Sequence, residues 1–128
     1  MNIEDFRKKE TVNSFEQIVA ALASRYGDEV NAFWLRHSEG KFPALHVVVN
    51  GDFASLHYFP AEGHPGLRSI GMTNSLPSGG ATTFFMTSLL EPELFPNRFV
   101  VPFSVAQEAA IEFFKGAEPP GCIHWFEL

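Results

Sequence analysis

Short runs of apolar or alternating residues occupy much of the chain, and they are rich in β-branched and aromatic side chains. Such runs occupy residues 31–37, 45–49, 53–59, 67–72, 81–88 and 122–127. In the first run, Phe33 and Leu35 share one face, while Ala32, Trp34 and Arg36 share the other, as a half-buried strand requires. The pattern predicts a mainly antiparallel sheet of five to seven strands.

The strongest local signal is the sequence Asn50-Gly51-Asp52, which separates two of these runs. Asn-Gly favours a tight hairpin turn, because both residues tolerate the positive φ angles that a primed turn requires. A polar loop at 61–66 precedes the next run. Residues 45–72 therefore predict a three-stranded antiparallel meander on which the other segments pack.

Residues 14–26 have the spacing of a helix. Ser14 and Gln17 match a capping box at its start, and Gly27 can close it in the left-handed conformation. Residues at three- and four-residue intervals predict its buried stripe. They are Phe15, Ile18, Val19, Leu22 and Tyr26.

A second helix is predicted over 104–115, beginning at Ser104 and ending at Gly116. Its predicted apolar face consists of Val105, Ala106, Ala109, Ala110, Phe113 and Phe114. Residues 89–102 are apolar but contain Pro92 and Pro96, which break helices. We expect a loop packed over a sheet edge there, with a short strand near 99–101.

The order of elements indicates the fold class. A helix, a series of strands, a second helix and a last strand favour an α+β fold over a parallel wound sheet. The length of 128 residues suits a single domain over 1–128. Residues 1–13 show neither the helical nor the strand spacing of apolar residues, so we expect a loosely ordered tail.

The net charge of the chain indicates which kinds of partner it can bind. Fifteen Asp and Glu against nine Lys and Arg give a net charge of −6, and Arg7, Lys8 and Lys9 lie in the tail. An acidic body disfavours direct nucleic-acid binding and suits a basic partner. The single Cys122 cannot form an internal disulfide. Without a signal-peptide pattern or a bilayer-length apolar stretch, we expect a cytoplasmic protein that contacts no membrane.

His46 and His57 are the residues best placed for chemistry. If the hairpin turn centres on Gly51-Asp52, they are cross-strand partners, close enough to share a metal ion. If it centres on Asn50-Gly51, the pairing is lost. A third ligand is not found at a motif spacing. A small metal-dependent or ligand-binding enzyme is the alternative interpretation; the main expectation is a non-enzyme with no catalytic residue, metal or cofactor.

Two stretches carry a family resemblance. The first is the string Leu56-His57-Tyr58-Phe59-Pro60 with Glu62-Gly63, Pro65-Gly66 and Ser69-Ile70-Gly71. The second comprises Val101-Pro102, the helix through Ala106, Ala109 and Phe113-Phe114, then Gly116, Pro119-Pro120, Trp125 and Glu127. Together they resemble the first numbered family of bacterial polymorphic-toxin immunity proteins (Imm1-like), from about residue 51 to the end.

This resemblance implies an α+β protein that binds and neutralises a cognate toxin in the producing cell. Toxins paired with such proteins often belong to the deaminase superfamily, so the implied partner is a basic, deaminase-type toxin domain. A toxin acting on nucleic acid presents cationic surface, which an acidic protein can cover. Exposure and charge predict the toxin-facing residues. They are Asp52, Glu62, His64, Glu91, Glu93 and Phe95.

Overall fold

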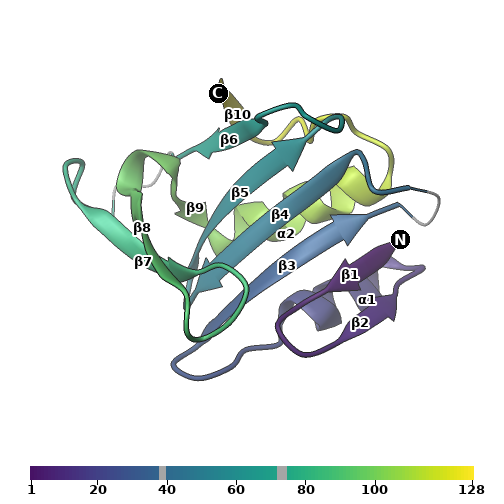
Figure 1. Cartoon of the computed structure of the whole chain (residues 1–128), viewed down its shortest axis with the longest axis horizontal. Coiled ribbons are helices and arrows are strands. Elements are labelled where there is room, and N and C mark those ends of the chain that lie inside the picture. The colour runs from purple at the N-terminus through teal and green to yellow at the C-terminus, as the bar shows by residue number, and fades with distance from the viewer. Residues whose placement is uncertain (38–39, 72–74) are drawn as a thin grey trace.

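One large sheet forms the middle layer of the molecule, with both helices on one face and a β-hairpin over part of the other (Figure 1). The structure is a computed structural model that describes residues 1–37, 40–71 and 75–128. The predicted α+β class, with two helices and a mainly antiparallel sheet, is confirmed.

The large sheet has eight strands, seven of them in the order β10-β6-β5-β4-β3-β1-β2. All of its pairs are antiparallel, and the predicted meander is β4-β5-β6. The seven strands are β1 (Asn2–Glu4), β2 (Lys9–Thr11), β3 (Val30–Arg36), β4 (Ala44–Asn50), β5 (Phe53–Phe59), β6 (Leu67–Ile70) and β10 (His124–Glu127). The short β9 (Val101–Pro102) pairs separately with β5. Met72, predicted to end the third strand of the meander, lies outside the described residues.

The N-terminal residues are ordered, contrary to the expectation of a loose tail. Strand β1 pairs with β2 and β3, and Ile3 lies opposite Leu35 with 2% of its surface exposed. Met1 and Val12 are also buried, and the Val12 N–H donates to the Met1 carbonyl at 2.8 Å. Strands of three residues are too short to show alternation, which is why the sequence pattern missed them.

Helix α1 (Phe15–Leu22) begins as predicted, with the Ser14 hydroxyl accepting the Gln17 N–H at 3.2 Å. It is shorter than predicted, because Tyr26 is held by a β-bridge to Val30. The buried stripe is also rotated from the predicted one. Ile18, Ala21 and Leu22 are buried, whereas Phe15 and Val19 are 43% and 41% exposed.

Helix α2 (Phe103–Phe114) begins after Pro102 and not at Ser104. Its first N–H, from Phe103, donates to the Asp52 carbonyl of the β4–β5 turn at 2.8 Å. A backbone acceptor therefore satisfies the first N–H of this helix, and no side chain caps it. The apolar face is largely as predicted, with four residues fully buried against the sheet. They are Ala106, Ala109, Ala110 and Phe113.

The expected loop over residues 89–102 is wrong for 92–96, whereas the short strand expected near 99–101 is present as β9, which begins at Val101. Residues Pro92–Pro96 form β8, which pairs with β7 (Ala81–Phe85) in a separate two-stranded sheet, and a 3-10 turn, η1 (Asn97–Phe99), leads into β9. The two prolines are compatible with a strand here because they lie at its ends, in a sheet with open edges. The hairpin buries Phe84 and Phe95 against the second face of the large sheet.

The segment after the hairpin is fixed to β5 and β6 by hydroxyl groups. The carbonyl of Phe99 accepts hydrogen bonds from the buried hydroxyls of Ser55 and Ser69, both at 2.8 Å. The Ser69 hydroxyl also accepts the backbone N–H of Leu56. Directly after β6, a Cβ on Gly71 would lie 2.0 Å from the Val100 carbonyl oxygen. Part of the family-like string Ser69-Ile70-Gly71 therefore serves close packing of the backbone.

We predict that Gly71→Ala destabilises the fold by about 2–3 kcal/mol, because the new methyl group cannot fit against a fixed backbone oxygen. Chemical denaturation measures this loss. The control is Gly79→Ala, where a Cβ would meet nothing within 4 Å. Equal stability of the two variants would contradict the close approach at Gly71.

Candidate interaction surface

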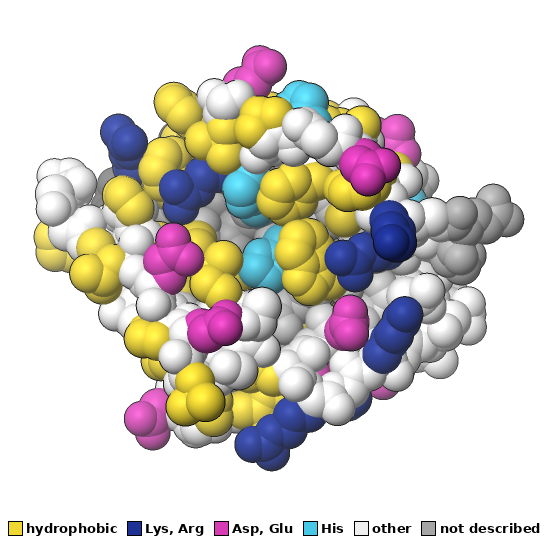
Figure 2. Space-filling model, viewed as in Figure 1, with side chains coloured by type: hydrophobic (Ala, Val, Ile, Leu, Met, Phe, Trp, Pro, Cys, Tyr) yellow, Lys and Arg dark blue, Asp and Glu magenta, His cyan; other side chains and the backbone are white. Residues whose placement is uncertain are grey.

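A single row of directly opposed residues crosses the sheet face that the helices leave free. From β6 to β1 the row reads Arg68, His57, His46, Trp34 and Glu4, each paired across strands with the next. Figure 2 shows histidines on the floor of a hollow in this face, between hydrophobic side chains.

The hairpin covers this face unevenly. On one side of the row, Ala32, Val48 and Ser55 are buried beneath it. On the other side, Phe59 and Arg36 remain partly exposed. The row therefore marks the boundary between the covered and the open half of the sheet. A cleft of about 310 Å³ opens there, lined by Glu4, Asp5, Phe6, Trp34, Met86 and Thr87.

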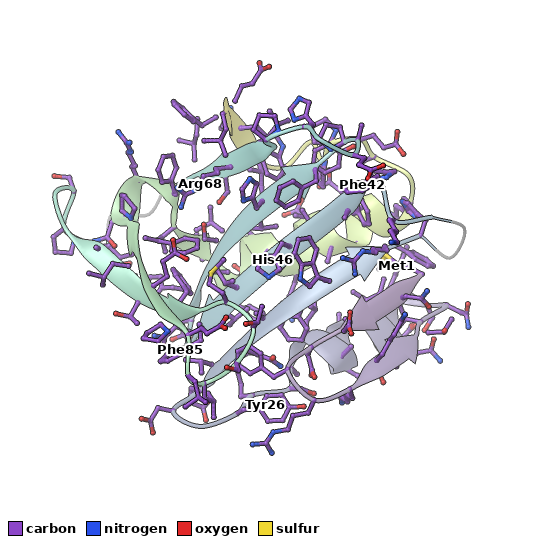
Figure 3. All side chains as sticks on the ribbon, in the orientation of Figure 1. Met1, Tyr26, Phe42, His46, Arg68 and Phe85 are labelled. Carbon is purple, nitrogen blue, oxygen red and sulfur yellow. The ribbon has the colours of Figure 1, made fainter. Side chains whose placement is uncertain are left out.

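Stacked rings form the floor of the hollow (Figure 3). Trp34 stacks on His46 with 4.2 Å between ring centroids, and His57 stacks on Phe59 at 4.1 Å. The guanidinium group of Arg36 lies 4.7 Å from the Trp34 ring centroid and 3.8 Å from Glu4. Flat, rigid rings of this kind give contact area at a low entropy cost.

Both histidines are neutral at pH 7. Burial lowers the pKa of His46 to about 4, the positive charges of Arg36 and of a protonated His57 add to the decrease, and a hydrogen bond with the Met86 backbone opposes it. Burial also lowers the pKa of His57. The buried Nε2 atom of His46 has no hydrogen-bond partner within the described residues. A neutral ring in an apolar setting is the state that this environment favours.

The pairing of His46 with His57 confirms the register in which the turn centres on Gly51-Asp52. It does not complete a metal site. Within the described ranges, no third His, Cys, Asp or Glu donor joins the pair, and His57 Nε2 already lies 3.1 Å from the Pro65 carbonyl. The enzyme interpretation built on these histidines therefore lacks its third ligand.

The described residues do contain one group of three potential metal ligands, formed by Glu108, Glu112 and Cys122. Glu112 there accepts the backbone N–H groups of Gly121 and Cys122, at 2.8 and 3.2 Å. Burial, with Glu112 and Glu108 nearby, raises the pKa of Cys122 to about 12. The sulfur is therefore a thiol at neutral pH and a poor ligand, and the group connects the end of the chain to α2.

A family model described as Immunity protein Imm1 matches residues 7–127, nearly the whole chain. The chain belongs to the Imm1 family. Membership makes it an immunity protein against a toxin, and it confirms the resemblance read from the sequence. A comparison with curated proteins finds no match. Neither of the described helices has the length and apolar character needed to cross a membrane.

The residues predicted to face the toxin in this Imm1 protein lie in separate places. Asp52 is exposed at the β4–β5 turn, while Glu62 and His64 lie in the β5–β6 loop. The seven residues of β5 separate these two loops by roughly 23 Å. Glu91 and Glu93 are exposed on the hairpin. The structure thus places Asp52 and the Glu62–His64 loop at opposite ends of strand β5.

Phe95 differs from the other predicted contact residues, because it is 8% exposed and points into the molecule. Its ring packs on Phe84 with centroids 5.1 Å apart, and the Arg68 guanidinium lies 4.9 Å from it. Phe95 therefore packs within the hairpin and contacts the guanidinium group of Arg68. Sequence reasoning missed the opposite side of β8, where Leu94 is 67% exposed. Strand alternation would have revealed this, had 92–96 been recognised as a strand.

We predict that His46 makes folding stability depend on pH. Below pH 6.5 the unfolded state binds a proton at this ring, whereas the folded state does so only near pH 4. The free energy of unfolding should therefore decrease by about 3 kcal/mol between pH 6.5 and 4 through this residue. Denaturant titrations across this range test it.

The comparison variant is His46→Phe, which keeps a flat ring on Trp34 and removes the titrating group. It should depend less on pH than the wild type, while His124→Gln, a change at an exposed position, should retain the wild-type profile. Identical profiles for wild type and His46→Phe would contradict the assignment.

Proposed function

We propose that this Imm1 protein neutralises a nucleic-acid-targeting, deaminase-type toxin by covering its active or substrate-binding surface, in the cytoplasm of the producing cell. The observation that carries the proposal is the family match over residues 7–127. The chain acts in this proposal by binding alone, with none of its own side chains taking part in a reaction.

The charge of the chain supports a partner that handles nucleic acid. Such a toxin must hold phosphate groups and therefore presents Lys and Arg around its active site. The net charge of −6 on the immunity protein complements that surface. Attraction between the two accelerates their encounter, and it raises the rate most at low salt.

The proposed contacts are Asp52, Glu62, His64, Glu91 and Glu93, with Phe95 acting from beneath. Glu91 and Glu93 are exposed on the hairpin, where they can approach a cationic surface without desolvating the core. His64 is held by its own loop, because its Nδ1 atom accepts the Gly66 N–H at 2.8 Å. A toxin that touched all of these residues would span the length of β5.

We predict that Glu91→Lys/Glu93→Lys slows association with the toxin domain by on the order of 10-fold at low salt and changes dissociation less. The test combines stopped-flow association at several salt concentrations with the purified toxin domain encoded beside this chain. Glu16→Lys/Glu127→Lys is the control, because it makes the same change in net charge at two other exposed acidic positions.

Equal association rates for both double variants would show that Glu91 and Glu93 make no specific contribution to association with the toxin. The toxin class is tested separately, by adding the wild-type chain to the toxin acting on single-stranded DNA and RNA substrates. One equivalent should abolish base deamination. A toxin that binds tightly but modifies no nucleic acid would refute the proposed class and leave the immunity function intact.

A further inference from the structure

The β7–β8 hairpin carries the most exposed large apolar side chains of the described residues. Leu90 is 89% exposed and Leu94 is 67% exposed. Strand alternation explains the second value, because Phe95 points into the molecule and its neighbour Leu94 must point away. Leucines this exposed gain nothing from folding, so their surroundings indicate what else they can contact.

A groove lies beside these leucines, between the hairpin and the connection from α1 to β3. It has a volume of about 420 Å³, and its apolar lining includes Val30, Phe85 and Leu89. The methyl groups of Leu89 lie within about 3.3 Å of where a Cβ on Gly27 would be, which packs the hairpin loop against this connection. Phe85 is labelled in Figure 3, at this end of the sheet.

Acidic residues lie in and next to the segments that line the same groove. Asp28 lines it directly, Glu91 follows Leu90 in the chain, and the Glu29 carbonyl accepts the Gly51 N–H of the neighbouring β4–β5 turn at 2.9 Å. Figure 2 shows acidic and hydrophobic side chains interspersed on this side of the molecule. Asp52 is exposed in the β4–β5 turn, two residues after Asn50, which also lines the groove.

Arg25, a cation of the connection from α1 to β3, makes internal contacts. Arg25 is partly buried with its guanidinium 4.5 Å from the Phe103 ring centroid, and it donates to the Leu22 and Ser24 carbonyls. Burial lowers its pKa, and Glu29 and Asp52 oppose that decrease. Arg25 is therefore held by internal contacts, and the charged side chain that lines the groove, Asp28, is negative.

The backbone at Glu29 is strained, because its φ of 67° is left-handed and it is not a glycine. Glycine would adopt this conformation at lower cost. Glu29 lies in the chain between Asp28 and Val30, which line the groove, at a position where glycine would fold better. Such conflicts between stability and residue choice are typical of binding surfaces.

We propose that this surface, made of Leu90, Leu94, the groove and the acidic residues in and next to its lining segments, is the main contact for the toxin. The inference rests on the proposed function. The segment it fits is one that presents an apolar side chain between Lys or Arg residues. An apolar centre with a charged rim is the usual anatomy of a specific interface.

Contact occurs through side chains and not by adding a strand to β8. Pro92 and Pro96 supply no backbone N–H at either end of that strand. An incoming strand would therefore lack part of its hydrogen-bond ladder. The apolar groove next to β8 offers a better site for an inserted side chain.

We predict that Leu90→Ser/Glu91→Lys weakens binding of the toxin domain at least 30-fold in calorimetry. Glu127→Lys/Leu128→Ser is a matched control, because it alters the same two residue types, changes the net charge equally, and lies at exposed positions of β10 and the residue after it. The control should bind within threefold of the wild type. Both variants should keep the wild-type melting temperature.

Glu29→Gly separates a binding role from a folding role. It should raise the melting temperature by relieving strain and still weaken toxin binding, a combination that a purely structural residue would not give. If the wild-type chain fails to bind the toxin, the proposed function and this inference both fail.

If the wild type binds and the hairpin variant binds equally well, the inference fails alone. Light scattering without toxin provides a further check. Loss of a dimer in Leu90→Ser/Glu91→Lys, together with unchanged toxin affinity, would assign the surface to a second copy of the chain and overturn the inference.

Discussion

The Phe99 carbonyl accepts hydrogen bonds from two buried serine hydroxyls. These bonds fix the segment after the β7–β8 hairpin, the element that covers the sheet face opposite the helices. Ser55 and Ser69 come from adjacent strands of the sheet, and both donate to this one oxygen. A buried carbonyl left without partners would be costly, so the bonds are most valuable when both are made. They position η1 and β9, and through them the base of the hairpin.

Asn97 extends this attachment to the hairpin itself. Its side chain donates to the Pro77 carbonyl at 2.8 Å and accepts from the Thr82 hydroxyl at 2.7 Å. Its backbone N–H donates to the Gly80 carbonyl. The segments that enter and leave the hairpin are thus both bonded to Asn97, which fixes the position of the hairpin over the sheet. The hollow lies on one side of the hairpin and the outer groove on the other.

The sequence predicted those parts of the fold that depend on long local patterns. The meander, a hairpin turn within residues 50–52 and both helices could be recognised because their signals lie within a few residues of one another, but these signals do not decide where the turn centres. The hairpin strand at 92–96 could not, because proline is usually evidence against a strand and only its position at a free edge permits it. The three-residue strands near the N-terminus were missed because their burial depends on contact with β3.

The candidate site was predictable to the same extent. The pairing of His46 with His57 follows from the turn register, whereas the row from Arg68 to Glu4 needs the order of strands, which no local pattern contains. Phe95 was expected at the surface because its phase along β8 was unknown. Its neighbour Leu94, one step along the strand, occupies the exposed position instead.

The two sides of β8 also differ in how freely their residues can change. Inward residues such as Phe95 share the core with Phe84, so each substitution there affects the fold. Leu94 on the outward side, and Leu90 in the loop before β8, are largely exposed, and altering them costs little stability. An immunity protein built this way could acquire a new toxin partner by changing one side of a single hairpin, without any need to redesign its sheet.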